Sequence, residues 1–241
     1  MSDLLNIGLV VADDGEYAAI ENYSGISLKE NNFYKRKGHT FSIKNNNRII
    51  NVNSVLCGIG KVNAACATQY LIDKGADVIL NFGLSGGISG VRRGEDIIGI
   101  KYFEHDFDLT CIGYKPCEKP SQEYIYSADK TLVKTFQKDN LFKKTGVFAS
   151  GDCFVSDNNL RERLHDLFNA ACCDMETAAI AYTAYSAGVP FACLRRVSDD
   201  AGDTATDDYL SMNGKSDTEL FEKVLTGINN IIYENSFWTA D

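Results

Sequence analysis

Five carboxylates stand where a folded chain would gather polar groups for acid–base chemistry. They lie beside short apolar runs or at the expected starts of helices: Glu16, Asp174, Glu176, Asp199 and Asp200. Taken singly, each is more simply explained as a solvated side chain or as a negative charge that stabilises a helix N-terminus. Two carboxylates from well-separated strand ends can also converge on one site. If their environments push their pKa values apart, one can act as an acid and the other as a base.

Other ligand-binding patterns in the chain are incomplete. Gly58-x-Gly60 follows an apolar run, but Asn63 stands where a dinucleotide fingerprint needs a third glycine. The Gly83–Gly87 segment lacks the Gly-Lys-Ser/Thr ending of a P-loop, so we expect a turn or a loop that lets backbone approach a ligand. His105 has no His or Cys partner at metal-binding spacing, and no Gly-x-Ser-x-Gly nucleophile motif occurs. The patterns favour neither a nicotinamide cofactor nor a metal.

The elements that must position these residues alternate between strand and helix. Apolar runs predict strands at residues 7–12, 77–82, 96–103, 145–150 and 190–195, and a hairpin within residues 32–56. Helices are predicted at residues 16–20, 61–74, 128–140, 158–169, 173–187 and 218–233. This order predicts an α/β fold, a three-layer α/β/α sandwich around a mixed, largely parallel sheet, with residues 1–241 in a single domain. Ligands bind beyond the carboxyl ends of the strands in such sheets.

The amino-acid composition of the chain argues against two classes of binding partner. The chain has 241 residues, of which 44% are hydrophobic and 24% charged, as in an ordinary globular protein. Its net charge of -9 argues against a nucleic acid or an anionic membrane as the main partner. The first residues show neither the basic start nor the apolar core of a signal peptide. We therefore expect a cytoplasmic protein whose 8 cysteines stay reduced.

Seven motifs that occur in order along nearly the whole chain carry a family resemblance. They are Glu16 after the first strand, Gly58-Ile-Gly-Lys-Val-Asn-Ala-Ala65, Asn81-Phe-Gly-Leu-Ser-Gly-Gly-Ile88, His105-Asp-Phe-Asp-Leu-Thr-Cys-Ile-Gly-Tyr114, Ser150-Gly-Asp-Cys-Phe-Val155, Asp174-Met-Glu-Thr-Ala-Ala-Ile-Ala181 and Arg195-Arg-Val-Ser-Asp199. Together they resemble the purine nucleoside phosphorylase/uridine phosphorylase superfamily. Within it, the chain is most similar to the 5′-methylthioadenosine/S-adenosylhomocysteine nucleosidases.

The resemblance implies a nucleoside phosphorylase-like fold and a hydrolase that cleaves adenine from a 5′-substituted ribose without a metal or cofactor. Asp199, oriented by Ser198, would donate a proton to N7 of adenine, so that the base leaves in neutral form. Glu16, with Arg195 nearby, would position and deprotonate the attacking water. Carboxylates also suit the oxocarbenium-like sugar that forms as the bond breaks.

The remaining roles implied by the resemblance concern binding. Glu176 would bind the ribose hydroxyls, and Met175 would lie against the sugar. Phe154 would stack on adenine while the Val155 backbone reads its polar edge. The other substrate-binding candidates are Ile59, Ser85, Tyr209 and Asp13. The family also implies a homodimer in which Leu109, Ile112 and the Pro120 region of one subunit complete the 5′ pocket of the other.

Three positions depart from the family pattern. Leu84 replaces the Ser or Thr that usually follows Gly83, although Ser85 comes next. Asp13 stands where the family usually has Met, and Tyr209 where it usually has Phe. These last two changes make the 5′ pocket more polar, and they predict a preference for a 5′-hydroxyl or amino-bearing group over methylthio, for example adenosine or S-adenosylhomocysteine. In the alternative interpretation, Asp13 simply turns to solvent.

Two other functions stay open. A phosphorylase would need a phosphate site built with arginines, which neither the first loop nor residues 81–83 contain. The acidic first loop would also repel phosphate. A nucleoside-binding protein without catalytic activity is the alternative from another class, and the presence of Glu16, Glu176 and Asp199 argues against it.

Overall fold

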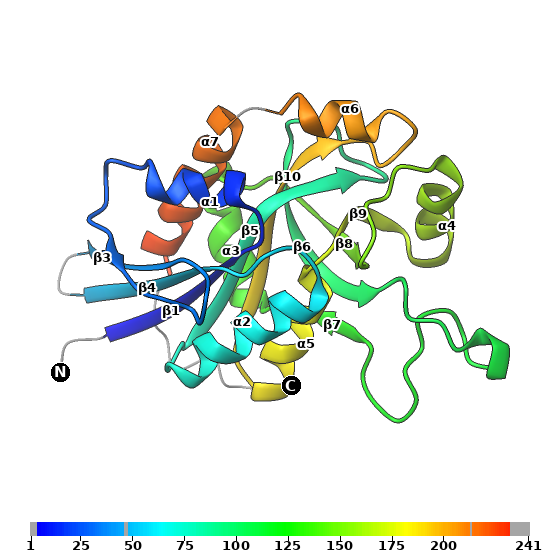
Figure 1. Cartoon of the computed structure of the whole chain (residues 1–241), viewed down its shortest axis with the longest axis horizontal. Helices are drawn as coiled ribbons and strands as arrows, with labels where there is room; N and C mark the ends of the chain where they lie inside the picture. Colours follow the sequence, from blue (N-terminus) through cyan, green and yellow to red (C-terminus); the bar gives the residue numbers. More distant parts are fainter. Residues whose placement is uncertain (1–3, 46–47, 213, 232–241) are drawn as a thin grey trace.

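The computed structural model describes residues 4–45, 48–212 and 214–231, and its strands form one mixed sheet (Figure 1). The strands are β1 (Leu4–Val11), β2 (Lys29–Glu30), β3 (Gly38–Asn45), β4 (Arg48–Leu56), β5 (Val78–Gly87), β6 (Asp96–Glu104), β7 (Ile125–Ser127), β8 (Lys144–Ser150), β9 (Ala170–Asp174) and β10 (Phe191–Asp199). The helices are α1 (Asp14–Glu21), α2 (Lys61–Asp73), α3 (Lys130–Gln137), α4 (Asn158–Phe168), α5 (Thr177–Ala187), α6 (Ala205–Leu210) and α7 (Gly214–Asn229), with 3₁₀ turns at Thr110–Ile112 and Lys138–Asn140.

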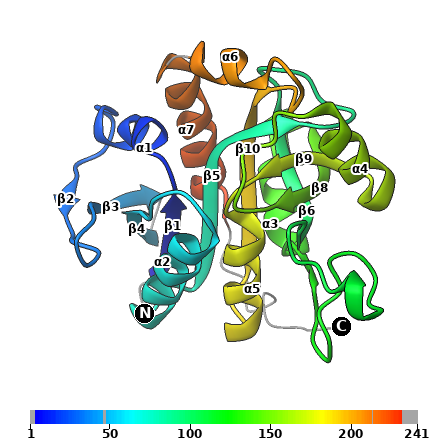
Figure 2. The same ribbon diagram turned by 45° about the vertical axis from the view of Figure 1, so that its right-hand side comes forward.

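The pairing of the strands closes part of the sheet on itself. β1 lies between β4 and β5 in parallel pairing, and β5 also pairs in parallel with β10. β6 and β9 pair in parallel with the two sides of β8. Antiparallel pairs then join β10 to β6 and β5 to β9, so that β5, β10, β6, β8 and β9 form a closed ring (Figure 2). The predicted α/β fold with a mixed sheet is confirmed, and the closure is a feature that the sequence did not reveal.

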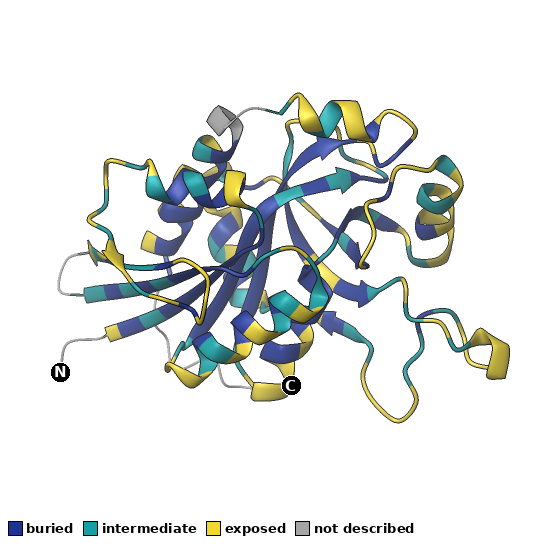
Figure 3. Ribbon diagram, in the orientation of Figure 1, coloured by how far each residue is buried: buried dark blue, intermediate teal, exposed yellow. Residues whose placement is uncertain are grey.

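Helices cover both faces of the sheet, because side chains on each strand alternate between the faces. On β1, Ile7 and Leu9 pack into a cluster with α1, α3 and α7, whereas Val10 packs into a cluster with α2 and α5. A third, smaller cluster includes Leu164 of α4. The buried ribbon along β1, β5 and β10 in Figure 3 shows that these strands run through the middle of the molecule. Glu16 follows β1 in the first turn of α1, and Asp199 ends β10.

Three predicted elements differ from the structure, two of them near the site. The Gly83–Gly87 segment is the end of β5 rather than a loop, because β10 pairs with it on one side and β9 on the other. Residues 173–174 belong to β9, and the helix predicted from residue 173 begins at Thr177. The helix predicted for residues 128–140 ends at Gln137, since Asp139 has φ of 55°. Of the last predicted helix, residues 232–233 lie outside the described residues.

No helix in the described parts of the chain has both the length and the apolar character needed to cross a membrane.

Candidate active site

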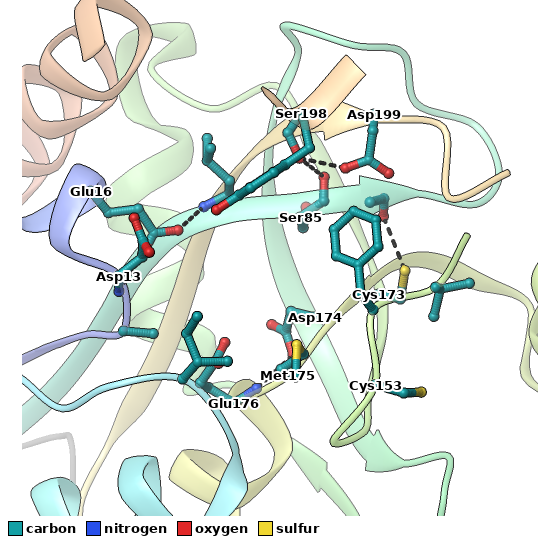
Figure 4. Close-up of a pocket in the computed structure, with 17 residues that line it drawn as sticks. Asp13, Glu16, Ser85, Cys153, Cys173, Asp174, Met175, Glu176, Ser198 and Asp199 are labelled. Carbon is teal, nitrogen blue, oxygen red and sulfur yellow. Dashed lines mark hydrogen bonds between the residues drawn. The ribbon is translucent and has the colours of Figure 1, made fainter. Parts of the chain in front are cut away.

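A cavity of about 310 Å³ opens where the carboxyl ends of β1, β5, β9 and β10 meet (Figure 4). Every predicted catalytic or substrate-binding residue except Arg195 lines it: Asp13, Glu16, Ile59, Ser85, Phe154, Val155, Met175, Glu176, Ser198, Asp199 and Tyr209. Leu84, Cys153, Cys173 and Asp174 are among the further lining residues. Residues from distant parts of the sequence therefore share one pocket, as expected for ligand sites in α/β sheets.

Glu16 is held by the first turn of α1 and by the edge of β5. Asp13 caps the helix through its side chain, and its backbone N–H lies 3.3 Å from Glu16 Oε2, forming a capping box. The N–H of Leu84 donates to Glu16 Oε1 at 2.6 Å. Leu84 thus contributes its backbone N–H to the site, while its side chain has no hydroxyl to offer.

Burial controls the protonation of Glu16. Removal from water raises the pKa of this carboxyl to about 8, although Arg195 and the Leu84 N–H both act to lower it. A carboxyl with a pKa in this range exchanges protons near neutral pH, as a general base must.

Arg195 lies behind the cavity rather than in its wall. Its guanidinium is fully buried and donates through Nε and Nη2 to Asp174 Oδ2, at 3.2 and 3.0 Å. Nη2 also donates to Thr177 Oγ1 at 3.0 Å and lies 3.7 Å from Glu176 Oε2. The structure therefore places Arg195 among the carboxylates as a buried counter-charge.

Asp174, one of the five candidate carboxylates of the sequence but without a predicted role in the site, is a positioning residue. Besides binding Arg195, it accepts hydrogen bonds from Ser150 Oγ at 2.5 Å and from the hydroxyl of Thr177. Burial acts to raise the pKa of Asp174, but Arg195 and these donors outweigh it and hold the pKa below its ordinary value. In the sequence, the only sign of this role was that Asp174 lies two residues before Glu176, in the same motif.

Glu176 occupies the middle of the pocket wall, just before α5. Its Oε1 accepts from the N–H of Gly60 at 2.9 Å, which ties it to the loop after β4. Burial raises its pKa, and the negative charge of Asp174 raises it further. A carboxyl fixed in this way can accept hydrogen bonds from ligand hydroxyls.

Asp199 and Ser198 form a short hydrogen-bonded chain at the end of β10. Ser198 Oγ lies 2.7 Å from Asp199 Oδ2 and 3.2 Å from the carbonyl oxygen of Ser85. Because a hydroxyl has one proton, Ser198 can donate to Ser85 while its oxygen accepts a hydrogen bond from a neutral Asp199. The Ala201 N–H donates to the other oxygen at 2.8 Å. Burial raises the pKa of Asp199, which favours the protonated form.

Aromatic and apolar side chains line the same pocket as Asp199. The Phe154 ring is 44% exposed and meets Tyr209 edge to face, with 5.6 Å between the ring centroids. Val155 is buried beside it, and Ile59 is exposed at the mouth. A free aromatic face next to a proton donor suits a planar ligand with basic nitrogen atoms.

A network of charges joins two loops at the rim. Asp152 Oδ1 accepts from the Lys61 N–H at 2.8 Å, and the Asp152 N–H donates to Asp106 Oδ2 at 2.9 Å. Lys61 Nζ lies 2.6 Å from Asp106 and 2.9 Å from Glu104. These contacts, absent from the sequence prediction, hold the loop of Ile59 against the loop that carries Phe154.

The residues expected to complete a neighbouring subunit's pocket lie elsewhere in this chain. Leu109, Ile112 and Pro120 belong to the segment between β6 and β7, which projects from the body of the molecule (Figures 1 and 2). None of them lines the cavity, and Ile112 is 68% exposed. In residues 4–45, 48–212 and 214–231, no three His, Cys, Asp or Glu side chains are placed to hold a metal ion.

Replacing Gly83 by Ala is expected to disrupt the pairing of Glu16 with its partners. A Cβ at this position would lie 2.3 Å from Arg195 Nη1 and 2.5 Å from Glu16 Oε1. Both side chains would have to move, at a cost of about 1–3 kcal/mol in unfolding free energy. Steady-state kinetics and thermal unfolding of Gly83→Ala measure the two effects. An unchanged kcat/KM would show that the spacing of Glu16 and Arg195 is not critical.

Comparison with known proteins identifies the superfamily to which the chain belongs. The family model described as "Phosphorylase superfamily" matches residues 6–228. The structure resembles futalosine hydrolase of Helicobacter pylori strain 26695, with a TM-score of 0.86, 24% identity, and coverage of 94% of this chain and 98% of that one. It is also similar to a Helicobacter pylori 5′-methylthioadenosine/S-adenosylhomocysteine nucleosidase in complex with a substituted pyrrolidin-3-ol, with a TM-score of 0.87, 23% identity, and coverage of 95% of this chain and 100% of that one. The fold and the pocket thus define a member of this superfamily.

Relatives that are similar in sequence identify the family within this superfamily. A 5′-methylthioadenosine/S-adenosylhomocysteine nucleosidase of Geobacillus thermodenitrificans is 34% identical over 196 residues, covering 76% of this chain and 83% of that protein. The corresponding nucleosidase of Staphylococcus carnosus is 36% identical over 183 residues, covering 72% and 80%. The chain belongs to the 5′-methylthioadenosine/S-adenosylhomocysteine nucleosidase family of the phosphorylase superfamily.

Proposed function

We propose that this protein hydrolyses the N-glycosidic bond of adenine nucleosides such as 5′-methylthioadenosine and S-adenosylhomocysteine, releasing adenine. One observation carries the proposal. Two buried carboxyls with raised pKa values, Glu16 and Asp199, line the same cavity, and Glu176 lies in its wall between them. The relatives at 34% and 36% identity, which are nucleosidases by name, support the same activity.

In the proposed mechanism the bond between C1′ of the sugar and N9 of adenine breaks as the sugar becomes oxocarbenium-like. Asp199 transfers its proton to N7, so that adenine leaves neutral. Glu16 accepts a proton from water, whose hydroxyl adds to C1′. Glu176 accepts hydrogen bonds from the ribose hydroxyls, and its negative charge stabilises the developing cation. Arg195, anchored on Asp174, limits the repulsion among these carboxylates.

The base-binding part of the proposal rests on Phe154 and Val155. The exposed ring of Phe154 stacks on adenine, and the Val155 backbone reads its polar edge. Met175 and Ile59 lie along the sugar, as their positions in the cavity wall allow. The proposed roles involve neither a metal nor a cofactor.

A phosphorylase remains the nearest alternative, and the charges of the pocket disfavour it. No Lys or Arg is found among the described lining residues. Arg195, the cation behind the wall, is engaged by Asp174. Phosphate would therefore meet Asp13, Glu16 and Glu176 without a matching positive group.

The proposal includes a homodimer in a cytoplasmic setting. The exposed Ile112, with Leu109 and Pro120, lies on the projecting segment between β6 and β7, which supports a role at the pocket of a second copy. All of the cysteines are free thiols in the structure, as a reducing compartment would maintain them.

The test is a product assay with purified protein and a panel of purine nucleosides. Release of adenine from methylthioadenosine or S-adenosylhomocysteine is the expected result. Tight binding of these nucleosides without any release of adenine would instead identify a binding protein.

A further inference from the structure

The loop between β8 and α4 carries Phe154 between two anchored residues. Among the residues that the structure describes, no hydrogen bond reaches the backbone of Cys153, Phe154 or Val155. The nearest hydrogen-bonded residues are Asp152 on one side and Asp157, the N-cap of α4, on the other. The Val155 side chain is buried, whereas the Phe154 ring is exposed. The position of this ring therefore depends on how Asp152 is held.

Asp152 belongs to a closed cycle of hydrogen bonds with Lys61 and Asp106, which we call the Lys61 cycle. The N–H of Lys61, the first residue of α2, donates to Asp152 Oδ1 at 2.8 Å. The Asp152 N–H donates to Asp106 Oδ2 at 2.9 Å, and Lys61 Nζ closes the cycle on Asp106 Oδ1 at 2.6 Å. The cycle thus joins the start of α2 to the segments that follow β6 and β8.

The residue before Lys61 ties this cycle to the sugar side of the pocket. The Gly60 N–H donates to Glu176 Oε1 at 2.9 Å. Gly60 has φ of 100°, and a Cβ at this position would lie 3.1 Å from Asp152 Oδ1. Two successive N–H groups at the start of α2 therefore bind the carboxylate proposed for the ribose and the loop proposed for the base.

Lys61 is the cation on which the Lys61 cycle depends. In the parts of the chain that the structure describes, no other cationic side chain lies within ion-pair distance of Asp106 or Asp152. Burial acts to raise the pKa of Asp106, but the Lys61 ammonium and the Asp152 N–H outweigh it and hold the pKa below its ordinary value. Lys61 Nζ also lies 2.9 Å from Glu104, which has a second partner in Lys119. Without the ammonium, the repulsion between Asp106 and Asp152 would push the loop away from α2.

We propose that Lys61 is a positioning residue that, through this cycle, sets the place of the Phe154 ring and with it the affinity for the base. The inference rests on the proposed function, which places adenine at Phe154 and the ribose at Glu176. Lys61 does not line the cavity, so it acts on the ligand through the loop rather than by contact.

The experiment measures the dissociation constant of adenine by calorimetry, and kcat and KM for methylthioadenosine, on the whole chain. Lys61→Met keeps an unbranched side chain but removes the ammonium. The dissociation constant and KM are both expected to rise about tenfold or more, the range of a hydrogen bond to a charged group. The value of kcat is expected to stay within about threefold, because the reacting carboxyls are untouched. Lys144→Met removes a cation that is paired with Glu95 away from the cavity, and this matched control should change neither constant.

Two further variants separate the Lys61 cycle from the general stability of α2. Asp152→Ala opens the cycle at a different bond by changing an exposed side chain, and it is expected to weaken adenine binding in the same way. It also decides the question if Lys61→Met does not fold. Adding Asp106→Asn to Lys61→Met removes the unpaired charge but keeps an oxygen for the Asp152 N–H. The double variant is therefore expected to bind adenine more tightly than Lys61→Met.

The binding constants separate the possible failures. If Lys61→Met or Asp152→Ala folds and binds adenine as tightly as the wild type, the inference is wrong while the proposed hydrolase function stands. A fall in kcat with an unchanged KM, or a double variant that binds adenine no better than Lys61→Met, also overturns the inference. If the wild-type protein neither binds adenine nor releases it from methylthioadenosine, the proposed function itself fails.

Discussion

Replacing Asp199 by Asn is expected to lower kcat/KM for adenine release by about 10²–10⁴-fold, the usual contribution of a positioned general acid. The amide has nearly the same shape as the carboxyl and keeps an oxygen for the Ala201 N–H, which now donates to Asp199 Oδ1 at 2.8 Å. It has no acidic proton for N7 of adenine. The base would then have to leave as an anion, which raises the barrier.

A binding measurement on Asp199→Asn shows whether the variant has lost the catalytic step or the ability to bind the nucleoside. The dissociation constant for a non-hydrolysable C-nucleoside analogue of adenosine is expected to change little, since Phe154, Val155 and Glu176 are untouched. Asp200→Asn is the control, because this neighbouring side chain is exposed and lies 3.9 Å from Arg161 outside the cavity. Full activity of Asp199→Asn would refute its role as the acid.

Replacing Glu16 by Gln is expected to abolish activity and at the same time to stabilise the folded protein at and above neutral pH. The pKa of Glu16 is about 8 when folded, against 4.5 for the ordinary side chain, chiefly because it is buried. Stability from the neutral form is present in full below the unfolded pKa and is lost as pH rises toward 8. Glutamine is always neutral, so the variant escapes this loss, on the order of 3 kcal/mol at pH 7.

Denaturant unfolding of both proteins between pH 5 and 9 measures this effect. The two curves are expected to converge at the acidic end and to separate as pH rises. Glu21→Gln is a matched control on the same helix, where the side chain forms a surface ion pair with Lys37 at 3.3 Å and a change within about 0.5 kcal/mol is expected. If the variant is less stable than the wild type across the whole pH range, ionisation of the buried Glu16 carboxyl does not destabilise the folded protein, and the prediction is wrong.

The acid and the base also predict a bell-shaped dependence of kcat/KM on pH. The active form carries one proton in total on these two carboxyls. Asp199 holds this proton and is neutral, while Glu16 is ionised. Loss of that proton at high pH follows the higher of the two pKa values, so the alkaline limb is expected near the Glu16 value of about 8. Asp199, raised by burial from 3.8, sets the acidic limb.

Sequence reasoning located the strand ends because their signals are local. The apolar run before Asp13 and the run before Ser198 each form a buried strand, β1 and β10. The family resemblance that the motifs carry then implied one pocket for Glu16, Glu176 and Asp199, and the structure brings all of them to its wall. Strand ends can be read from neighbouring residues, whereas the shared pocket depended on the resemblance.

The features of the site that could not be predicted from the sequence depend on contacts between segments that are distant in the chain. Glycines disfavour strands on their own, so Gly83–Gly87 was predicted to be a loop, although pairing with β9 and β10 makes it part of β5. Sequence alone also could not show that Arg195 is turned toward Asp174 behind the wall, because its side chain is oriented by partners 18 to 21 residues away. The raised pKa of Glu16 follows from burial, which only the folded structure reveals.

The identity of the sugar product tests the central claim most directly. The protein is incubated with methylthioadenosine with and without inorganic phosphate, and the products are separated and identified by mass spectrometry. Hydrolysis predicts adenine and free 5-methylthioribose at a rate that does not depend on phosphate. Formation of 5-methylthioribose 1-phosphate, or a rate that requires phosphate, would contradict the account.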